Sequence, residues 1–356
     1  MTSSLNDPES DQNRNIVSEA FRDSGAPLNS DLYNFMHGIK SVNPGVSSAP
    51  ANRDSTGYTL FTKPVLNLTY DNINLIRKLE FLGDEDPLGM ACAIKCALSP
   101  YGIHVSVPQD NSARNIRSRI EDDKSAFISC LSNGLISLSG WPDKTLDTYT
   151  SAEGIAKEVI SMVDGRVDQY GSYDLSADFR NVRGDVIPTL ISAWVEYMGR
   201  VAEGTISPYP VMIAENEIDY MTRIYRIVMD ESDNYVTKIG SCGGAFPIAV
   251  PNAAAFNVDR NRVISDANTQ VSLPFKCIGF EDNDPILIKE FNEVVEMFNI
   301  DMREEYREDR MIPMIGRYAE FRKALDHNFY PRIESDHRLV WYAPKTLFDR
   351  LFPGET

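Results

Sequence analysis

The sequence lacks any run of apolar residues long enough to cross a membrane. No stretch of its 356 residues approaches the ~18 consecutive apolar residues that a membrane-spanning helix needs. The N-terminus, MTSSLNDPESDQNRN, also lacks the apolar centre of a secretion signal. We therefore expect a protein that is made in the cytoplasm and has no membrane partner.

Cysteine is scarce and scattered. The chain has five cysteines, an odd number, and their spacing suggests no disulfide framework. Such usage is typical of free thiols buried in a protein of a reducing compartment. The five are Cys92, Cys96, Cys130, Cys242 and Cys277.

Basic residues are too few for a protein that binds nucleic-acid phosphates. The chain has 35 lysines and arginines against 52 aspartates and glutamates, which gives a net charge of −17. DNA binding through phosphate contacts is therefore disfavoured. An acidic excess is commonly a solubility device, and it also fits a surface that repels DNA and lets it pass without adhesion.

The familiar catalytic motifs are absent as well. The sequence contains no GxGxxG, GxxxxGK[ST], HExxH or GxSxG pattern. Its four histidines lie far apart in the chain, so they form no obvious cluster. We therefore expect no enzyme activity and no cofactor. The histidines are His37, His104, His327 and His337.

Three short segments have residue types that could carry chemistry. Cys92 and Cys96, with His104 downstream, could bind zinc, but their spacing also fits one buried helix face. The acidic runs 121–124 and 281–285 could pair carboxylates for acid–base catalysis. Such loops are common, and the second run also supplies a helix cap. The structural interpretation is favoured in each case, so we expect neither a metal site nor a catalytic site.

The composition is otherwise that of a folded protein with an N-terminal arm. Hydrophobic residues make up 42% of the chain and aromatic residues 10%, as in ordinary globular proteins. Residues 1–56 are rich in Ser, Asn, Asp, Pro and Gly, so we expect an extended or disordered arm. Residues 57–165 are predicted to form a mixed α/β insertion or N-terminal domain. Within them, residues 58–70 are typical of an edge strand or extended clip, because Pro64 interrupts the run.

A sheet-rich core is predicted over residues 166–282. Alternating apolar and polar side chains indicate strands in residues 172–182 and 270–280. Two further strands, about 218–229 and 235–242, are predicted to form a hairpin around the turn DESDN. Both faces of the first of these carry large apolar side chains, so we expect it to be covered on both sides.

Two amphipathic helices are predicted from apolar residues at three-and-four spacing. The first spans residues 187–204 and ends at a glycine. The second spans residues 284–299 and opens with Asp284 as its cap and Pro285 in its first turn. Residues 283–356 are predicted to be a C-terminal helical extension.

The stretch GSCGGAFPIAVPNAAAFNVD, residues 240–259, is small, apolar and rich in glycine. We interpret it as an uncharged loop that contacts the next subunit of an assembly, because glycines permit close approach and aromatic side chains anchor interfaces. The alternative is an internal core loop of a monomer. The candidate interface residues are Gly243, Gly244, Ala245, Phe246, Pro247 and Phe256.

The order of these elements resembles the tail-tube family of contractile-tailed bacteriophages. The resemblance is carried by the segments 184–210, 219–251 and 271–280. In that family a sheet-rich domain carries one packed helix, a strand pair leads into an Ala-Phe-Pro segment, here residues 245–247, and a final strand completes the sheet. The resemblance implies an α+β fold with a tail-tube-like β-sandwich or β-barrel core and one packed helix.

The resemblance also implies a function. A family member would be a structural virion protein, made in the host bacterial cytoplasm, that forms a homo-oligomeric ring, a hexamer, in the phage tail. It would contact other tail or baseplate proteins, and the genome DNA would pass through it without specific binding. The long segments on either side of the core suit a ring at a tube end, at the baseplate or at the neck better than a repeated tube subunit.

Two acidic turns are candidates for the rim of the DNA conduit. Both interrupt strands that should line the sheet, and the alternative is that they face solvent outside the ring. An unrecognised soluble enzyme, and a head or neck connector protein without a tube core, stay open as other functions. The candidate rim residues are Asp230, Glu231, Asp233, Glu281, Asp282 and Asp284.

Overall fold

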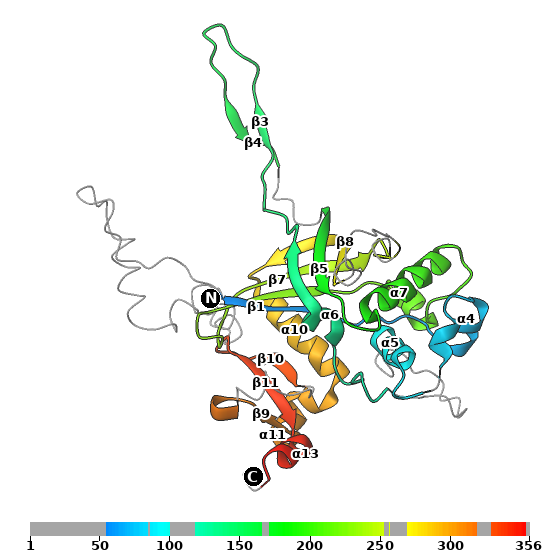
Figure 1. Cartoon of the computed structure of the whole chain (residues 1–356). Helices are drawn as coiled ribbons and strands as arrows, with labels where there is room; N and C mark the ends of the chain where they lie inside the picture. The colour runs from blue at the N-terminus through cyan, green and yellow to red at the C-terminus, as the bar shows by residue number, and fades with distance from the viewer. Residues whose placement is uncertain are drawn as a thin grey trace, which may run out of the picture.

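The computed structural model describes residues 55–84, 86–99, 118–165, 171–252, 256, 269–318 and 329–353. Its centre is a six-stranded antiparallel sheet with the strand order β1-β6-β7-β8-β5-β2 (Figure 1). The order begins with β1 and ends with β2, so the described residues form no closed barrel. The α+β class is confirmed, whereas the predicted sandwich or barrel is not. The strands are β1 (Ser55–Phe61), β2 (Leu135–Ser139), β5 (Ser172–Arg180), β6 (Ile224–Met229), β7 (Val236–Pro247) and β8 (Gln270–Asp282).

The alternation seen in the sequence places β5 and β8 correctly. Leu175, Ala177 and Phe179 of β5 are fully buried. Their partners in β8 are buried as well: Phe275, Leu273 and Val271. The predicted hairpin of β6 and β7 is confirmed as well. Its first strand begins later than predicted, at Ile224, and in the turn before it the Tyr220 carbonyl accepts a hydrogen bond from the Trp194 side chain at 3.0 Å.

Helix α7 (Val186–Ala202) covers one face of the sheet, as its apolar spacing predicts. It buries Trp194 and Tyr197 completely and ends just before Gly204, whose φ of 74° suits a glycine that terminates a helix. Helix α5 (Met90–Leu98) packs in the same apolar cluster. Ile73 of α4 (Tyr70–Leu75) and Leu131 of α6 (Ser129–Gly134) belong to this cluster as well. The short helix α8 (Pro210–Glu215) follows α7 in the chain.

Helix α10 (Pro285–Phe298) covers the other face. The Asp284 side chain accepts a hydrogen bond from the backbone N–H of Ile286 at 2.9 Å, so the predicted cap is confirmed. Phe291 of α10 meets Tyr225 of β6 edge to face, with ring centroids 5.4 Å apart. Strand β6 is thus fully covered on the α10 side, whereas on its other face Ile224 is buried and Arg226 and Val228 are only half-buried, so the predicted cover on both sides is confirmed in part. The sheet carries two packed helices rather than the single packed helix that the resemblance implied.

The C-terminal segment is not purely helical, which corrects the prediction for residues 283–356. It contains a second antiparallel sheet with the order β10-β11-β9, and this sheet packs against α10. The amide of Asn292 in α10 donates to the Ile333 carbonyl at 2.8 Å and accepts from its N–H at 3.0 Å. The elements are the 3-10 helix Ile300–Met302, α11 (Glu304–Arg310), β9 (Met311–Pro313), the 3-10 helix Gly316–Tyr318, β10 (Tyr330–Ile333), β11 (Leu339–Pro344) and α13 (Lys345–Leu351).

The central sheet also crosses two predicted boundaries. Strand β1 begins at Ser55, inside the predicted arm 1–56, and the residues before it lie outside the described part. It forms one edge of the sheet, as predicted for residues 58–70, and pairs Thr59 with Arg226. Most of β1 and all of β2 belong to the predicted segment 57–165, yet they extend the core sheet. The division into domains otherwise stays a prediction.

Candidate assembly surfaces

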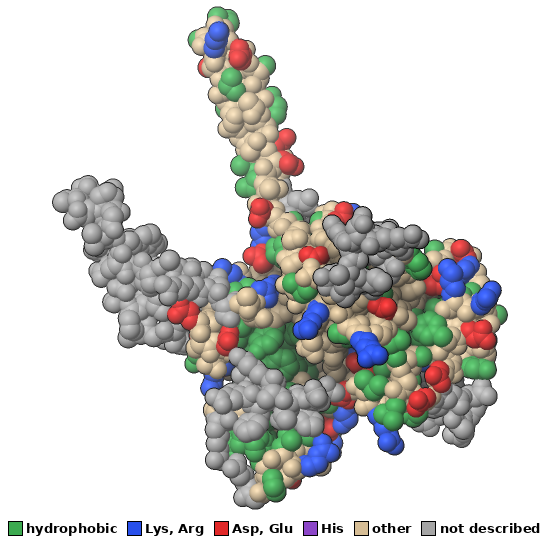
Figure 2. All heavy atoms as spheres, in the orientation of Figure 1, with side chains coloured by type: hydrophobic (Ala, Val, Ile, Leu, Met, Phe, Trp, Pro, Cys, Tyr) green, Lys and Arg blue, Asp and Glu red, His purple; other side chains and the backbone are tan. Residues whose placement is uncertain are grey.

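A two-stranded hairpin leaves the body of the molecule and has no part of the described chain packed along its length (Figures 1 and 2). We call residues 143–165 the hairpin arm. It pairs β3 (Thr148–Thr150) with β4 (Ser161–Val163), and every side chain of both strands is exposed. Its base is fixed by Trp141, whose ring lies 5.2 Å from that of Phe280. The arm is therefore an anchored projection of the chain.

One face of the hairpin arm carries its largest exposed apolar side chains, whereas the opposite face mixes the smaller Val163 with Thr148, Thr150 and Ser161. Tyr149 stands opposite Met162, and these side chains are 52% and 58% exposed. Ile160 follows on the same face, because side chains of a strand alternate, and it is 61% exposed. The next pair, Thr150 and Ser161, lies on the opposite face and joins its hydroxyl oxygens at 3.1 Å. An isolated hairpin is only marginally stable in water, so this apolar face is a candidate contact surface.

The predicted interface loop is in fact the end of strand β7, which corrects that interpretation of residues 243–247. Gly244 pairs with Ile278 and Phe246 with Lys276 of β8. Ala245 is fully buried and Pro247 is also buried, so neither side chain is available to another subunit.

The two glycines of this segment permit close packing within the monomer. A Cβ atom on Gly244 would lie 2.7 Å from the sulfur of Met221, and one on Gly243 would lie 3.0 Å from the Ile278 carbonyl oxygen. Contacts this short require Met221 or the β8 backbone to move, so glycine at both positions favours the close packing seen in the monomer. The glycines that suggested a subunit contact therefore have a function inside the chain.

The two predicted aromatic anchors have different surroundings. Phe246 is half-buried and meets Tyr220 edge to face, with ring centroids 5.9 Å apart. Phe256 is 81% exposed and borders a shallow pocket of about 290 Å³ together with Phe81 and Pro188. Of the six candidate interface residues, Phe256 is thus the one whose side chain is most available to a partner.

The predicted rim residues do lie at one end of the sheet. Strand β7 is antiparallel to both β6 and β8, so the turn after β6 and the end of β8 meet there, with Gly240 paired to Asp282. Several of the carboxylates have contacts within the chain. Asp230 accepts from the backbone N–H groups of Asn234 and Tyr235 at 3.0 and 3.1 Å. Asp282 pairs with Lys144 at the base of the hairpin arm, and Asp284 caps α10.

The acidic run 121–124, weighed above for catalysis, joins three elements of the fold. Glu121 forms an ion pair with Lys63 at 2.7 Å, and the Lys63 side chain is fully buried. Burial raises the pKa of the Glu121 carboxyl above its usual range. The Tyr330 hydroxyl donates to Asp122 at 2.6 Å, and Lys124 pairs with Asp301 at 2.8 Å. These contacts tie β1 to the C-terminal segment.

Of the candidate zinc ligands, only Cys92 and Cys96 can be placed, and these two thiols contact each other on one helix face. Cys92 and Cys96 are buried on α5, and His104 lies outside the described residues. Across the described ranges, no group of three His, Cys, Asp or Glu side chains is placed to hold a metal ion. Within those same ranges, no helix has the length and apolarity that a membrane crossing requires.

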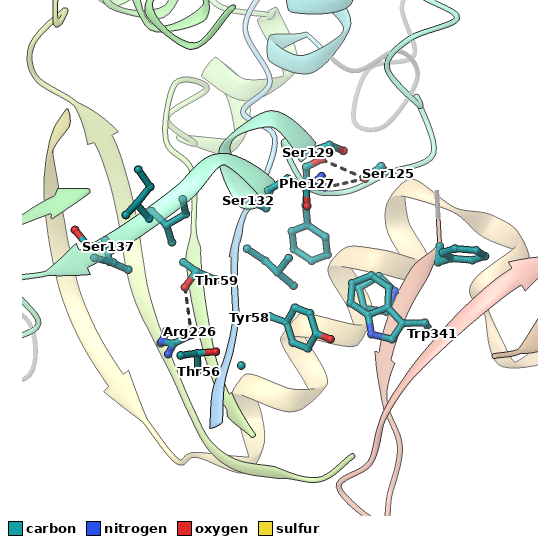
Figure 3. Close-up of a pocket in the computed structure, with 18 residues that line it drawn as sticks. Thr56, Tyr58, Thr59, Ser125, Phe127, Ser129, Ser132, Ser137, Arg226 and Trp341 are labelled. Carbon is teal, nitrogen blue, oxygen red and sulfur yellow. Dashed lines mark hydrogen bonds between the residues drawn. The ribbon is translucent and has the colours of Figure 1, made fainter. Parts of the chain in front are cut away.

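A cavity of about 810 Å³ lies between the two edge strands of the sheet (Figure 3). It is bounded by residues 56–60 of β1, by residues 129–138 of α6 and β2, by Arg226 of β6 and by Trp341 of β11. We call it the β1/β2 slot. Sequence reasoning missed it, because its two walls are far apart in the chain and neither carries a motif.

The family model of putative phage tail tube proteins matches residues 5–355. The chain belongs to the phage tail tube protein family. No curated protein matches the chain. The family assignment makes this tail tube protein a structural component of a phage tail, and it confirms the resemblance seen in the order of its elements.

Solved structures that share features with this tail tube protein come from contractile injection systems. The anti-feeding prophage cap, a tube-terminating cap, is 12% identical, with 45% of this chain and 83% of that chain covered and a TM-score of 0.27. The sheath/tube terminator of the PVC extracellular contractile injection system in its extended state is 12% identical, with 42% of this chain and 84% of that chain covered and a TM-score of 0.24. The PVC sheath-tube complex in its extended state is 14% identical, with 45% of this chain and 84% of that chain covered and a TM-score of 0.25.

Proposed function

We propose that this tail tube protein forms a homo-oligomeric ring in which the hairpin arm of each subunit lies on a neighbouring subunit. The observation that carries the proposal is the apolar face of the arm, where Tyr149 and Met162 are more than half exposed. Two strands that pack on nothing bury too little apolar surface to be stable alone. A contact with another subunit supplies that burial.

The finer features of the ring follow from charge and family. We propose a hexamer at a tube end, at the baseplate or at the neck, because much of the chain lies outside the central sheet. Other tail proteins would contact the C-terminal sheet or the residues before β1.

The net charge of −17 and the acidic end of the sheet support a lumen through which DNA passes without adhesion. Gly243 and Phe256 remain candidate interface residues, because their positions are exposed.

Shortening the arm tests the proposal. Replacing residues 145–163 by a short Gly-Ser turn removes no buried side chain, so we expect circular dichroism and the melting temperature of the monomer to stay nearly unchanged. Ring formation, followed by light scattering after size exclusion and by electron microscopy, should be lost. A ring that forms without the arm would refute the proposed contact.

A matched pair of double variants localises the effect to one face. Tyr149→Ser with Met162→Ser keeps the arm but removes its apolar pair, and we expect it to weaken ring formation strongly. Thr150→Ala with Ser161→Ala changes the adjacent pair on the opposite face and should leave the ring intact. Equal effects of the two double variants would contradict a contact through the apolar face.

A further inference from the structure

The β1/β2 slot has the form of a sheet with one strand missing. The sheet curls so that its first strand β1 and its last strand β2 both border the same cavity of about 810 Å³. Their walls meet at the segment 125–128, where Thr62 bridges to Phe127, and they diverge beyond it (Figure 3). A cavity between two sheet edges is a place where an extended chain can add a strand.

The backbone of β1 is oriented for such an addition. Phe61 accepts a hydrogen bond from the Ile128 N–H at 2.8 Å, and the Lys63 N–H donates to the Ala126 carbonyl at 2.9 Å, both on the side of β1 that faces away from β6. Because backbone groups of a strand alternate with a period of two, the N–H and C=O of Thr59 point the same way, into the slot. Among the described residues, no strand pairs with that edge of β1 or with the outer edge of β2.

The side chains of the slot combine an apolar wall with unsatisfied polar groups. Leu60, Phe127 and Trp341 supply apolar surface. The Ser132 hydroxyl is buried and has no hydrogen-bond partner within the described part of the chain. Among the described residues, Arg226 donates hydrogen bonds only to the Thr59 hydroxyl and the Ile227 carbonyl, both at 3.5 Å, and burial lowers its pKa. A half-buried guanidinium without a carboxylate favours an acidic ligand.

We propose that the β1/β2 slot accepts the hairpin arm of a second copy of this chain as an added strand. This inference rests on the proposed ring. The arm offers exposed strand edges, an apolar face for the wall of the slot, and Glu153 and Glu158 near its tip for Arg226. An arm cannot fill the slot of its own chain, because it leaves the body directly after β2 and points away from it (Figure 1).

Disulfide trapping tests the contact in the assembled protein. We would combine Ile136→Cys, at an exposed position of the slot, with Met162→Cys on the apolar face of the arm. Under mild oxidation of rings, this pair should give covalent dimers and a ladder of higher oligomers. The matched control combines Met162→Cys with Ile286→Cys. Ile286 lies on α10 outside the slot and is 58% exposed, against 52% for Ile136. We expect at least several-fold more cross-linked protein from the slot pair than from the control pair.

Amide hydrogen exchange gives a second readout that does not depend on substitution. Residues 57–60 should exchange more slowly in rings than in monomers, because a strand added to β1 protects its outward amides. Residues 224–229, already paired on both sides, should change little. Equal exchange of residues 57–60 in the two states would overturn the proposal.

The outcomes separate this inference from the ring itself. Normal rings in which the slot pair cross-links no better than the control pair would refute the slot as acceptor and leave the proposed function standing. Protection of residues 57–60 that is present in the monomer and disappears when residues 1–54 are removed would assign the slot to those residues and also refute the inference. A native chain that forms no ring would refute the proposed function first.

Discussion

Lys63 shows how strongly a single charge can be tied into this fold. Its side chain is completely buried, pairs with Glu121 at 2.7 Å and donates to the Asp122 carbonyl at 2.8 Å. Lys63→Met would leave the Glu121 carboxylate buried without its partner. We expect the free energy of unfolding in urea to fall by about 3–5 kcal/mol.

The double variant supplies the control for this prediction. Lys63→Met combined with Glu121→Met removes both buried charges, so it should lose much less stability than Lys63→Met alone. Equal losses in the single and double variants would show that the ion pair is not the cause.

The two candidate aromatic anchors give opposite predictions at the residue scale. Phe246→Asp puts a charge on a half-buried side chain that packs on Tyr220, so we expect it to destabilise the monomer by roughly 1–3 kcal/mol. Phe256→Asp changes a side chain that is 81% exposed and should leave the melting temperature unchanged. Thermal unfolding monitored by circular dichroism distinguishes them, and equal effects of the two variants would contradict the burial described here.

At the scale of elements, the two long helices α7 and α10 were predictable from the sequence because burial and capping leave local signals. Apolar residues at three-and-four spacing located α7 and α10, and Asp284 with Pro285 fixed the start of the second. Strands β5 and β8 were found because each has one buried and one exposed face. Alternation of apolar and polar residues identifies strands that are buried on one face only.

Elements with other environments were missed for identifiable reasons. Strands β3 and β4 have three residues each and are exposed throughout, so no alternation marks them. The end of β7 was taken for a loop because Gly243, Gly244 and Pro247 commonly signal turns. In the structure these glycines make room for Met221 and Ile278, contacts that a sequence pattern cannot show. The slot depends on how the whole sheet curls, so no local sequence pattern could predict it.

Asp284 is both a predicted rim residue and the cap of α10, and two substitutions can separate the effect of its charge from the effect of its hydrogen bond. Asp284→Ala removes the hydrogen bond to the Ile286 N–H and should lower the free energy of unfolding by about 1 kcal/mol. Asp284→Asn removes the negative charge but keeps a capping oxygen, so its stability in urea should stay close to that of the native chain. A large loss in Asp284→Asn would show that the charge, and not the cap, stabilises this helix end.

At the scale of the whole molecule, the described chain consists of a central sheet with helices on both faces and a hairpin arm that projects from it. The body buries its apolar surface by itself, with α7 on one face and α10 on the other. Within the described part of the chain, the hairpin arm and the β1/β2 slot are features that a monomer leaves incomplete. The proposed ring would account for both, because each subunit of a closed ring must offer one surface and accept another.

The measurement that tests the central claim most directly is an electron cryomicroscopy structure of the assembly formed by the purified full-length chain. The account predicts a closed ring in which each hairpin arm lies on the adjacent subunit, with the acidic end of the sheet around the lumen. A neutral or basic lumen would contradict the conduit and leave the ring standing. A chain that stays monomeric at high concentration, or a ring whose arms extend into solvent, would contradict the account itself.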